Sequence, residues 1–497
     1  MTEQAKIKFS ATEIRDLFGD LAAEDSDSER FDSYFVKLDV YDEIHNFLPL
    51  RILVAQKGVG KSAIFKKSLM EDQKNNILAI KITPDDVKDL VEGDDETKPL
   101  DLIRQWKSGL NDVILSEVIK KYEISSGSEL FKLISNKTLK ISSVLSTLSK
   151  KVSEIVDTEK VTKLLAQKYI ENKKIIIYID DLDRAWKGTK QNIERISALL
   201  NAVRDMSNDN QELCFRISLR SDVFYLVRTA DESTDKVTSN VVWMKWKNHE
   251  LLALLIKRVQ LFFGNNLETS QLLNMSQNSL SEYLKDIMDT PFKRQGKWNN
   301  KPIRFVLMTL IRNRPRDLIN LCTMAAKNAR QNKRNKIMSE DWEEITREYS
   351  SDRMQDTVNE HIYELPEIER LLLALKPTAD EIKNIKTKKP FIYSKQEFLK
   401  KIDNAMQAGK FNFSDGRPAN SDDLLTFLYK INYIVARKKL DNDYIQRVYF
   451  EDSKYITGIR NVDFGYDWEI HPAFRKILYL DSRDIFSLID IAEEITE

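Results

Sequence analysis

Hydrophobic positions follow two periodicities along the chain, and the change between them separates a central α/β region from helical flanks. Short runs of consecutive apolar residues are typical of strands buried in a parallel sheet. Five such runs occur, with amphipathic helical segments between most of them: RILVA (51–55), ILAIKI (77–82), IIIYI (175–179), CFRISL (214–219) and VVWMKW (241–246). Strands that alternate with helices predict a parallel sheet with helices on both faces.

Helical spacing dominates the region before the sheet and one long segment inside it. Residues 1–48 are predicted as a helical lead-in, whose first helix begins at a capping box of Ser10 and Glu13. Residues 83–172 carry amphipathic helical patterns and no strand pattern. They predict a helical insertion within a core that spans residues 49–248. We interpret the insertion as an extra helical layer; a docking layer for a partner is the alternative.

The region after the core is predicted as two further domains. Residues 249–350 are helical throughout and predict a lid. In residues 360–497, three helices precede two β-like runs. The third helix is predicted to include SDDLLTFLYKINYIVARKK (421–439). Three helices followed by two strands indicate a winged-helix-like C-terminal domain.

Composition adds limits on location and partners. Lys+Arg and Asp+Glu both number 78, so whole-chain charge favours neither a nucleic-acid nor a membrane partner. Cys214 and Cys322 lie far apart, which argues against a disulfide framework or a zinc site and favours a reducing cytosol. The first residues are polar, and the apolar helical stretch at 251–256 is too short to cross a bilayer. We therefore expect a soluble cytoplasmic protein.

The segment AQKGVGKS (55–62) stands between a predicted strand and a predicted helix. Its glycines permit a tight turn, and its main-chain N–H groups are expected to face one anion at the helix N-terminus. Lys61 is predicted to reach the β- and γ-phosphates, and the Ser62 hydroxyl to ligate Mg²⁺. Ala55 departs from the strict pattern, which begins with glycine. We predict binding of ATP with Mg²⁺ by Lys57, Gly58, Val59, Gly60, Lys61, Ser62 and Ala63.

The run IIIYIDDLDR places carboxylates at the end of a buried strand. Asp180 is predicted to hold Mg²⁺ together with Ser62, mostly through the water shell of the metal. Asp181 is predicted as the catalytic base or water-positioning residue, a role that the longer side chain of glutamate fills in many ATPases. Asp183 and Arg184 are interpreted as a structural pair, or as residues that face a neighbouring subunit.

Two arginines are candidates for contact with the γ-phosphate. Arg220 follows the strand 214–219 and is expected at the same sheet edge as Asp180; a surface arginine at a strand end is the alternative. Pro315 suits the first turn of a helix and so places Arg314 and Arg316 at its start. Arg316 is predicted to close over the nucleotide, and simple packing within the lid is the alternative.

Together, the AQKGVGKSAI loop, the IDDLDR and LRSD strand ends and the RPRDL helix resemble bacterial P-loop ATPases of the AAA+/STAND superclass, in particular the KAP-like ATPases. The resemblance covers residues 15–340. It implies a five-stranded core sheet in the order 5-1-4-3-2, followed by a helical lid. It also implies ATP-driven switching or assembly, a homo-oligomer and a role in bacterial antiviral defence. The chain shows no nuclease, protease or deaminase motif, so an effector enzyme is expected to be a separate protein.

Three functional hypotheses follow. The first is an ATPase switch that assembles or regulates a partner. The second is a DNA-binding ATPase, similar in plan to origin-recognition proteins. Its candidate surfaces are Arg437, Lys438 and Lys439 at the end of the third C-terminal helix, and the lid residues Lys327, Arg330, Lys333, Arg334 and Lys336. The third is an inactive ATPase that serves as a scaffold, which only Asp181 in place of glutamate favours.

Overall fold

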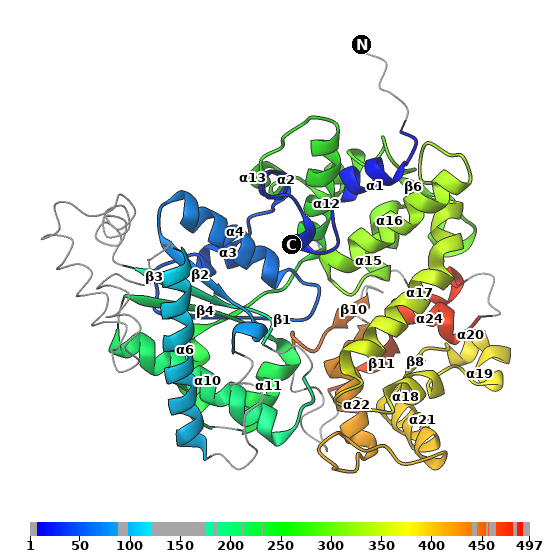
Figure 1. Ribbon diagram of the computed structural model, residues 1–497. Coiled ribbons are helices and arrows are strands. Elements are labelled where there is room, and N and C mark those ends of the chain that lie inside the picture. Colours follow the sequence, from blue (N-terminus) through cyan, green and yellow to red (C-terminus); the bar gives the residue numbers. More distant parts are fainter. Residues whose placement is uncertain are drawn as a thin grey trace, which may run out of the picture. The chain divides into compact units, whose positions relative to one another are not determined.

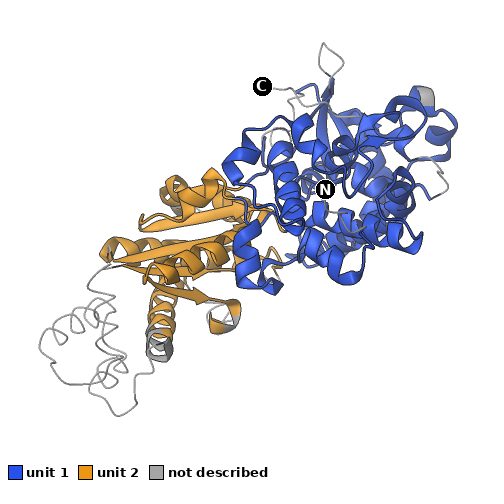
Figure 2. Cartoon of the chain, turned by 90° about the horizontal axis from the view of Figure 1, so that it is seen from above, with its two compact units in different colours: residues 1–36, 58–60, 245–497 blue, residues 37–57, 61–244 orange. Residues whose placement is uncertain are grey.

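The computed structural model describes residues 7–87, 98–121, 174–182, 186–210, 212–230, 232–439, 445–453, 456, 464–480 and 485–490 (Figure 1). The chain forms two compact units (Figure 2). The core unit comprises residues 37–57 and 61–244, and the lid unit comprises residues 1–36, 58–60 and 245–497. Three residues of the phosphate-loop motif therefore group with the lid rather than with the sheet.

A five-stranded parallel sheet forms the centre of the core unit. Its strands are β1 (Leu50–Ala55), β2 (Leu78–Ile82), β3 (Ile175–Ile179), β4 (Leu213–Arg220) and β5 (Val241–Trp243). Their order across the sheet, β2-β3-β4-β1-β5, confirms the predicted order 5-1-4-3-2. Because every pairing is parallel, the carboxyl ends of the strands share one edge, which is where such sheets bind ligands.

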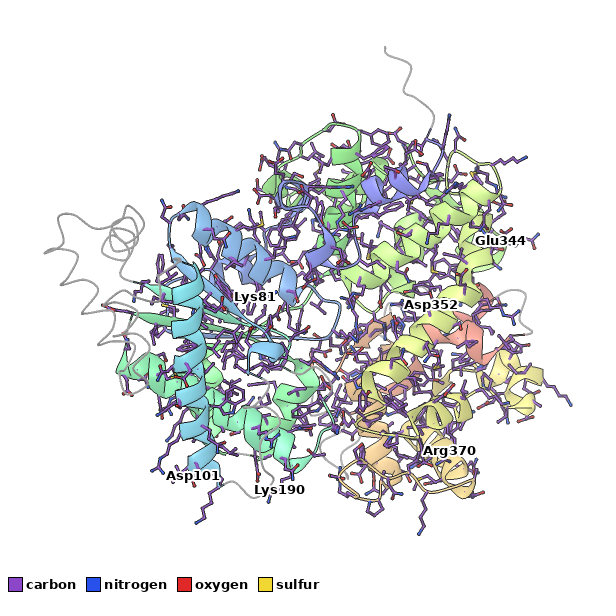
Figure 3. All side chains as sticks on the ribbon, viewed as in Figure 1. Lys81, Asp101, Lys190, Glu344, Asp352 and Arg370 are labelled. Atoms are coloured by element: carbon purple, nitrogen blue, oxygen red, sulfur yellow. The ribbon has the colours of Figure 1, made fainter. Side chains whose placement is uncertain are left out.

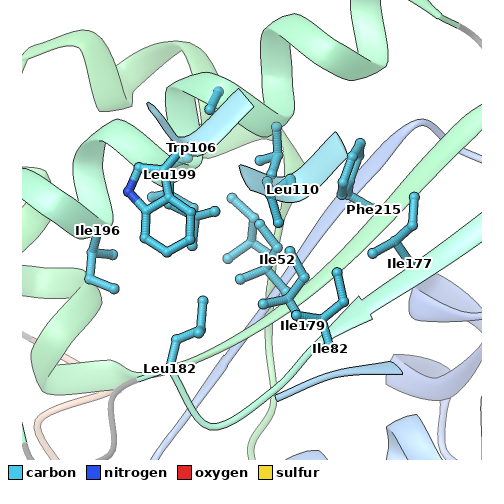
Figure 4. Packing of buried hydrophobic residues seen from close by; sticks show 14 of the residues in the cluster. Ile52, Ile82, Trp106, Leu110, Ile177, Ile179, Leu182, Ile196, Leu199 and Phe215 are labelled. Carbon is cyan, nitrogen blue, oxygen red and sulfur yellow. The ribbon is translucent and has the colours of Figure 1, made fainter. Parts of the chain in front are cut away.

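Helices cover both faces of this sheet. Figure 1 shows α3 and α4 on one face and α6, α10 and α11 on the other. Their bounds are α3 (Asp39–Ile44), α4 (Lys61–Lys74), α6 (Pro99–Lys121), α10 (Lys190–Asp209) and α11 (Ser221–Ala230). In the core below α6 and α10, Trp106, Leu110 and Leu199 pack over the isoleucines of the strands (Figure 4). Burial of each large apolar side chain stabilises the folded chain by about 1.5–3 kcal/mol. The consecutive apolar residues of the strands supply such side chains to both faces of the sheet. The predicted insertion spans residues 83–172. Its residues 88–97 and 122–172 lie outside the described residues, and α6 forms most of the remainder.

Polar contacts fix α4, the helix that begins at the phosphate loop, to its neighbours in the core unit. Asp72 of α4 is fully buried and accepts a hydrogen bond of 2.7 Å from the Tyr178 hydroxyl of β3. Nε2 of His45 lies 3.0 Å from the same carboxylate. Arg216 of β4, also fully buried, donates to the main-chain oxygen of Ile44 at 2.7 Å. The last part of the predicted lead-in is therefore bound to the sheet.

The lid unit begins with α1 (Ala11–Phe18) and α2 (Ser28–Tyr34). The predicted capping box is confirmed, because Ser10 and Glu13 exchange both hydrogen bonds. The helices that follow are α12 (Asn248–Phe262), α13 (Thr269–Leu273), α14 (Gln277–Glu282), α15 (Ile303–Leu310), α16 (Pro315–Gln331) and α17 (Ser339–His361), with a small hairpin of β6 (Pro291–Phe292) and β7 (Lys301–Pro302). α17 continues to His361, so one helix joins the lid to the C-terminal region.

The C-terminal region has a winged-helix-like arrangement of helices and an antiparallel sheet in the order β10-β9-β11-β8. Its elements are α18 (Ile368–Ala374), α19 (Ala379–Lys383), α20 (Ile385–Lys388), β8 (Ile392–Tyr393), α21 (Lys395–Gln407), α22 (Ser421–Lys430), β9 (Ile434–Lys439), β10 (Ile445–Val448), β11 (Asp467–Ile470) and α24 (Pro472–Leu478).

One prediction in this region is wrong. The third helix, α22, ends at Lys430, and residues 434–439 form strand β9 rather than a continuation of the helix. Asn432 has a φ of +55°, which a right-handed helix does not accept. The β-branched residues Ile434 and Val435 then favour a strand. Arg437, Lys438 and Lys439 therefore lie on a strand.

Both cysteines are buried and free. Among the helices that the structure describes, none combines the length and apolar character that a membrane crossing requires.

Candidate nucleotide-binding site

The phosphate-loop motif connects β1 to α4, as predicted. Gly58 and Gly60 have φ angles of +79° and +115°, which glycine adopts far more readily than other residues. Ala55, by contrast, is the last residue of β1 and pairs with Arg220 of β4. Its backbone is extended and its side chain is buried. The position that departs from the strict motif therefore does not need a glycine in this chain.

Lys61 is the first residue of α4, and its ammonium group lies over the loop. Nζ donates to the main-chain oxygens of Ala55 at 3.2 Å and Gln56 at 3.3 Å. Ser62 and Ala63 follow in the first turn and are partly exposed. The first N–H groups of a helix have no partner within the helix and carry partial positive charge, so this end suits an anion. Lys61 adds a full positive charge at the same place.

Asp180 follows β3 and is buried, with 3% of its surface exposed. Its Oδ1 accepts a short hydrogen bond from the Ser218 hydroxyl and a bond of 3.1 Å from the Asp181 N–H. Within the described residues, Oδ2 makes no hydrogen bond. Ser218 was not among the residues predicted for the site, although a serine inside the apolar run of β4 is a usable signal.

Asp181 is exposed and has a φ of +63°. Short polar residues such as aspartate and asparagine tolerate this left-handed conformation better than glutamate does. The backbone therefore supplies a physical reason for aspartate at this position. Its catalytic role stays a prediction.

Arg220 lies at the end of β4, at the same sheet edge as Asp180. Its guanidinium forms a buried bidentate pair with Asp222, in which Nε donates to Oδ1 at 3.0 Å and Nη2 to Oδ2 at 2.5 Å. Asp222 stands in the first turn of α11. The pair holds the Arg220 guanidinium in one orientation. Contact between Arg220 and a γ-phosphate stays a prediction, and the Asp222 carboxylate would take part in that contact.

Two residues of the lid unit contact the tip of the phosphate loop. The Arg316 N–H donates to the Gly58 oxygen at 3.3 Å, and a Cβ on Gly58 would lie 3.3 Å from the Arg316 Cβ. The Trp246 indole N–H donates to the Val59 oxygen at 2.8 Å. Within the described residues, the Arg316 guanidinium has neither a hydrogen bond nor an ion pair. Trp246 was not predicted for the site, because the apolar run 241–246 placed it at the end of a strand that in fact ends at Trp243.

Buried charges fix the start of α16 and hence Arg316. Asp317 accepts from Nε of Arg312 at 2.9 Å and from Nη1 of Arg353 at 2.7 Å. Burial alone would raise the pKa of Asp317, but these two arginines outweigh it and hold the pKa well below its usual range. Arg314, the N-cap residue of α16, lies 3.7 Å from Glu360 of α17. The predicted helix start is confirmed, with Pro315 at its first position.

The candidate DNA-binding residues have mixed placements. Arg437 is buried and pairs with Asp490 at 2.8 Å and Glu469 at 3.6 Å, so its prediction as a surface residue is wrong. Arg334 pairs with Asp341, and Lys336 donates to a main-chain oxygen. The remaining candidates that are exposed are Lys327, Arg330, Lys333, Lys438 and Lys439. Asp183 and Arg184 lie outside the described residues.

Asp180→Asn is expected to separate hydrolysis from binding. Asparagine keeps the size of the side chain but removes the charge that suits a divalent cation. We expect turnover of ATP to fall by about 10²–10³-fold, a loss typical for one electrostatic group. Phosphate release measures turnover, and calorimetric titration with ADP in the absence of Mg²⁺ should give a nearly unchanged affinity. Unchanged turnover in the variant would remove Asp180 from the site.

Comparisons with known proteins identify a family model for one part of the chain and no family for the whole chain. A family model described as the FunZ-associated C-terminal helical domain matches residues 249–358, from α12 into α17. No curated protein matches the chain significantly.

Several solved structures share weak similarity with the chain. A Walker-type ATPase of Pyrococcus abyssi is 13% identical, with 89% of this chain and 96% of that chain covered and a TM-score of 0.39. Cdc6p from Pyrobaculum aerophilum is 13% identical, with 95% and 97% covered and a TM-score of 0.31. The ORC2 protein of Aeropyrum pernix, in ADPNP-ADP complexes, is 12% identical, with 95% and 98% covered and a TM-score of 0.33. The strand order and loop geometry, rather than these values, carry the fold assignment. Membership among the KAP-like ATPases stays a prediction.

Proposed function

We propose that the chain is a P-loop ATPase that binds ATP with Mg²⁺ and uses the state of the nucleotide to control its assembly with a partner. The observation that carries this proposal is the position of Lys61 and Asp180. Lys61 begins α4 directly after a loop with two glycines of positive φ, and Asp180 directly follows β3, which β4 separates from β1 in the same parallel sheet. Both residues therefore lie at the carboxyl edge, where phosphate and metal are bound in such sheets.

The groups at this edge fit the proposed ligands. The N–H groups of the loop and the Lys61 ammonium would hold the phosphates. The Ser62 hydroxyl and the buried Asp180 carboxylate are oxygen ligands of the kind that Mg²⁺ prefers. Bound Mg²⁺ neutralises charge on the phosphates. Ser218 keeps one oxygen of Asp180 occupied, and the exposed Asp181 carboxylate would orient the attacking water.

The contacts of the loop tip support a switch. Gly58, Val59 and Gly60 group with the lid unit, and two of their carbonyl oxygens accept hydrogen bonds from it. A change in the loop on phosphate binding would therefore act on the lid directly. The partners in this proposal are further copies of the chain and a separate effector protein. The role in antiviral defence rests on the sequence resemblance alone.

The test is light scattering of the wild type and of Lys61→Ala, each with and without ATP and Mg²⁺. We expect the mass of the wild type to change with nucleotide and the mass of the variant to stay constant. Calorimetric titration of the same samples shows whether ATP binds. Wild type that does not bind ATP would contradict the nucleotide site, and wild type that binds ATP without a change in mass would contradict the assembly switch.

A further inference from the structure

The tip of the phosphate loop is held from outside by a tryptophan. The indole N–H of Trp246 donates to the main-chain oxygen of Val59 at 2.8 Å. Trp246 is 8% exposed and Val59 is 5% exposed, so the bond is shielded from water. An unpaired carbonyl in such a place is unfavourable, which makes the indole N–H a necessary partner rather than an incidental one.

The geometry of the peptide gives this bond a consequence for the loop. A peptide unit is planar, and in the trans form its C=O and N–H point in opposite directions. The structure contains no cis peptide within the described residues. Holding the Val59 oxygen toward Trp246 therefore directs the Gly60 N–H to the opposite side. In the same way, the bond from the Arg316 N–H to the Gly58 oxygen directs the Val59 N–H.

The two glycines explain why an external partner is needed. Glycine adopts positive and negative φ about equally, so peptides that adjoin Gly58 and Gly60 can rotate at low cost. A rotated Val59–Gly60 peptide would present its oxygen, instead of its N–H, to an anion. The loop sequence allows the required conformation, but it does not by itself select it.

We infer that Trp246 is a positioning residue for nucleotide binding, because its indole N–H holds the Val59–Gly60 peptide with the Gly60 N–H directed to the phosphates. The inference rests on the proposed function. The bond from Trp246 to Val59 is then the specific contact through which the loop and the lid unit influence each other. The phosphates favour one orientation of the Val59–Gly60 peptide, and Trp246 favours the same orientation. By linkage, the tryptophan and the nucleotide stabilise each other.

Trp342 provides a matched control. It lies in α17 of the lid unit and is fully buried, and its indole nitrogen has no hydrogen-bond partner among the described residues. Trp342→Phe therefore makes the same change in a buried ring of the same unit without removing a hydrogen bond. Any general effect of a smaller ring on the lid unit should appear in both variants.

The experiment compares the wild type, Trp246→Phe and Trp342→Phe by calorimetric titration with ADP and with ATP. We expect Trp246→Phe to weaken binding of both nucleotides by about tenfold, the value of one lost buried hydrogen bond. Trp342→Phe should stay within about twofold of the wild type. Thermal unfolding provides the second readout: saturating ADP should raise the melting temperature of Trp246→Phe by less than it raises that of the other two proteins.

The outcomes separate the inference from the proposed function. Wild type that does not bind nucleotide removes the proposed function. Wild type that binds, together with Trp246→Phe of equal affinity, overturns the inference, and a lower melting temperature of that variant without nucleotide would then mark a merely structural role. If Trp246→Phe does not fold, replacement of Trp246 by benzothienylalanine keeps the ring size and removes only the N–H. The same tenfold loss is then expected, and wild-type affinity would again overturn the inference.

Discussion

Lys61→Ala is expected to lower ATP turnover by about 10²–10³-fold, the loss typical for one group that stabilises developing charge. ATP affinity should fall as well, because the ammonium lies over the loop and adds a full positive charge at the helix N-terminus. In the structure, Lys61 is partly exposed, and Nζ donates to the main-chain oxygens of Ala55 and Gln56. The fold should therefore be little affected. Steady-state phosphate release and titration with ATP measure the two effects.

Lys81→Ala is the control for this prediction. Lys81 lies in β2 of the same sheet, and its side chain is exposed (Figure 3). The substitution removes the same charge from the core unit without touching the loop. We expect turnover within about twofold of the wild type, because the Lys81 side chain is exposed and most exposed substitutions have small effects. Equal losses in the two variants would show that net charge, and not the loop, is responsible.

Glu469→Gln is expected to destabilise the C-terminal region by about 3–5 kcal/mol, the cost of leaving buried charges without a partner. Glu469 of β11 is fully buried and accepts two bonds of 2.9 Å from Arg447 of β10. It also accepts a short bond from Arg475 of α24 and lies 3.6 Å from Arg437 of β9. One carboxylate thus joins three strands and a helix. Urea unfolding of the wild type and the variant measures the loss.

The same residue predicts a dependence of stability on pH. Burial alone would raise the pKa of Glu469, but Arg447 and Arg475 outweigh it and lower the pKa to about 2. An unfolded glutamate has a pKa of about 4.3. The contribution of Glu469 is therefore complete above about pH 4.3 and is lost as the pH falls toward 2. Within that window, the stability of Glu469→Gln should depend less on pH than that of the wild type.

Glu369→Gln separates this effect from a general change of charge. Glu369 lies in α18 of the same unit and is exposed. Its replacement should change the free energy of unfolding by less than about 0.5 kcal/mol. A loss in Glu469→Gln as small as in this control would mean that the buried cluster contributes little.

The strands of the core were predictable because each is a short apolar run that must be covered on both faces. β9 was not, because its residues continue the apolar spacing of α22 without a break in the local pattern. The turn at Asn432 and the pairing of β9 with β10 and β11 decide its conformation. Those partners come later in the chain, and local periodicity carries no information about them.

The phosphate loop could be recognised from the residues alone, because a lysine and two glycines between a strand and a helix act through their own main chain. So could the acidic strand end at Asp180. The partners that hold these groups become visible only in the folded chain. The Ser218 hydroxyl reaches Asp180 across 38 residues, and the Trp246 indole reaches Val59 across 187 residues. A single hydrogen-bond donor leaves no periodic trace in the sequence, and its partner is fixed only when distant segments pack together.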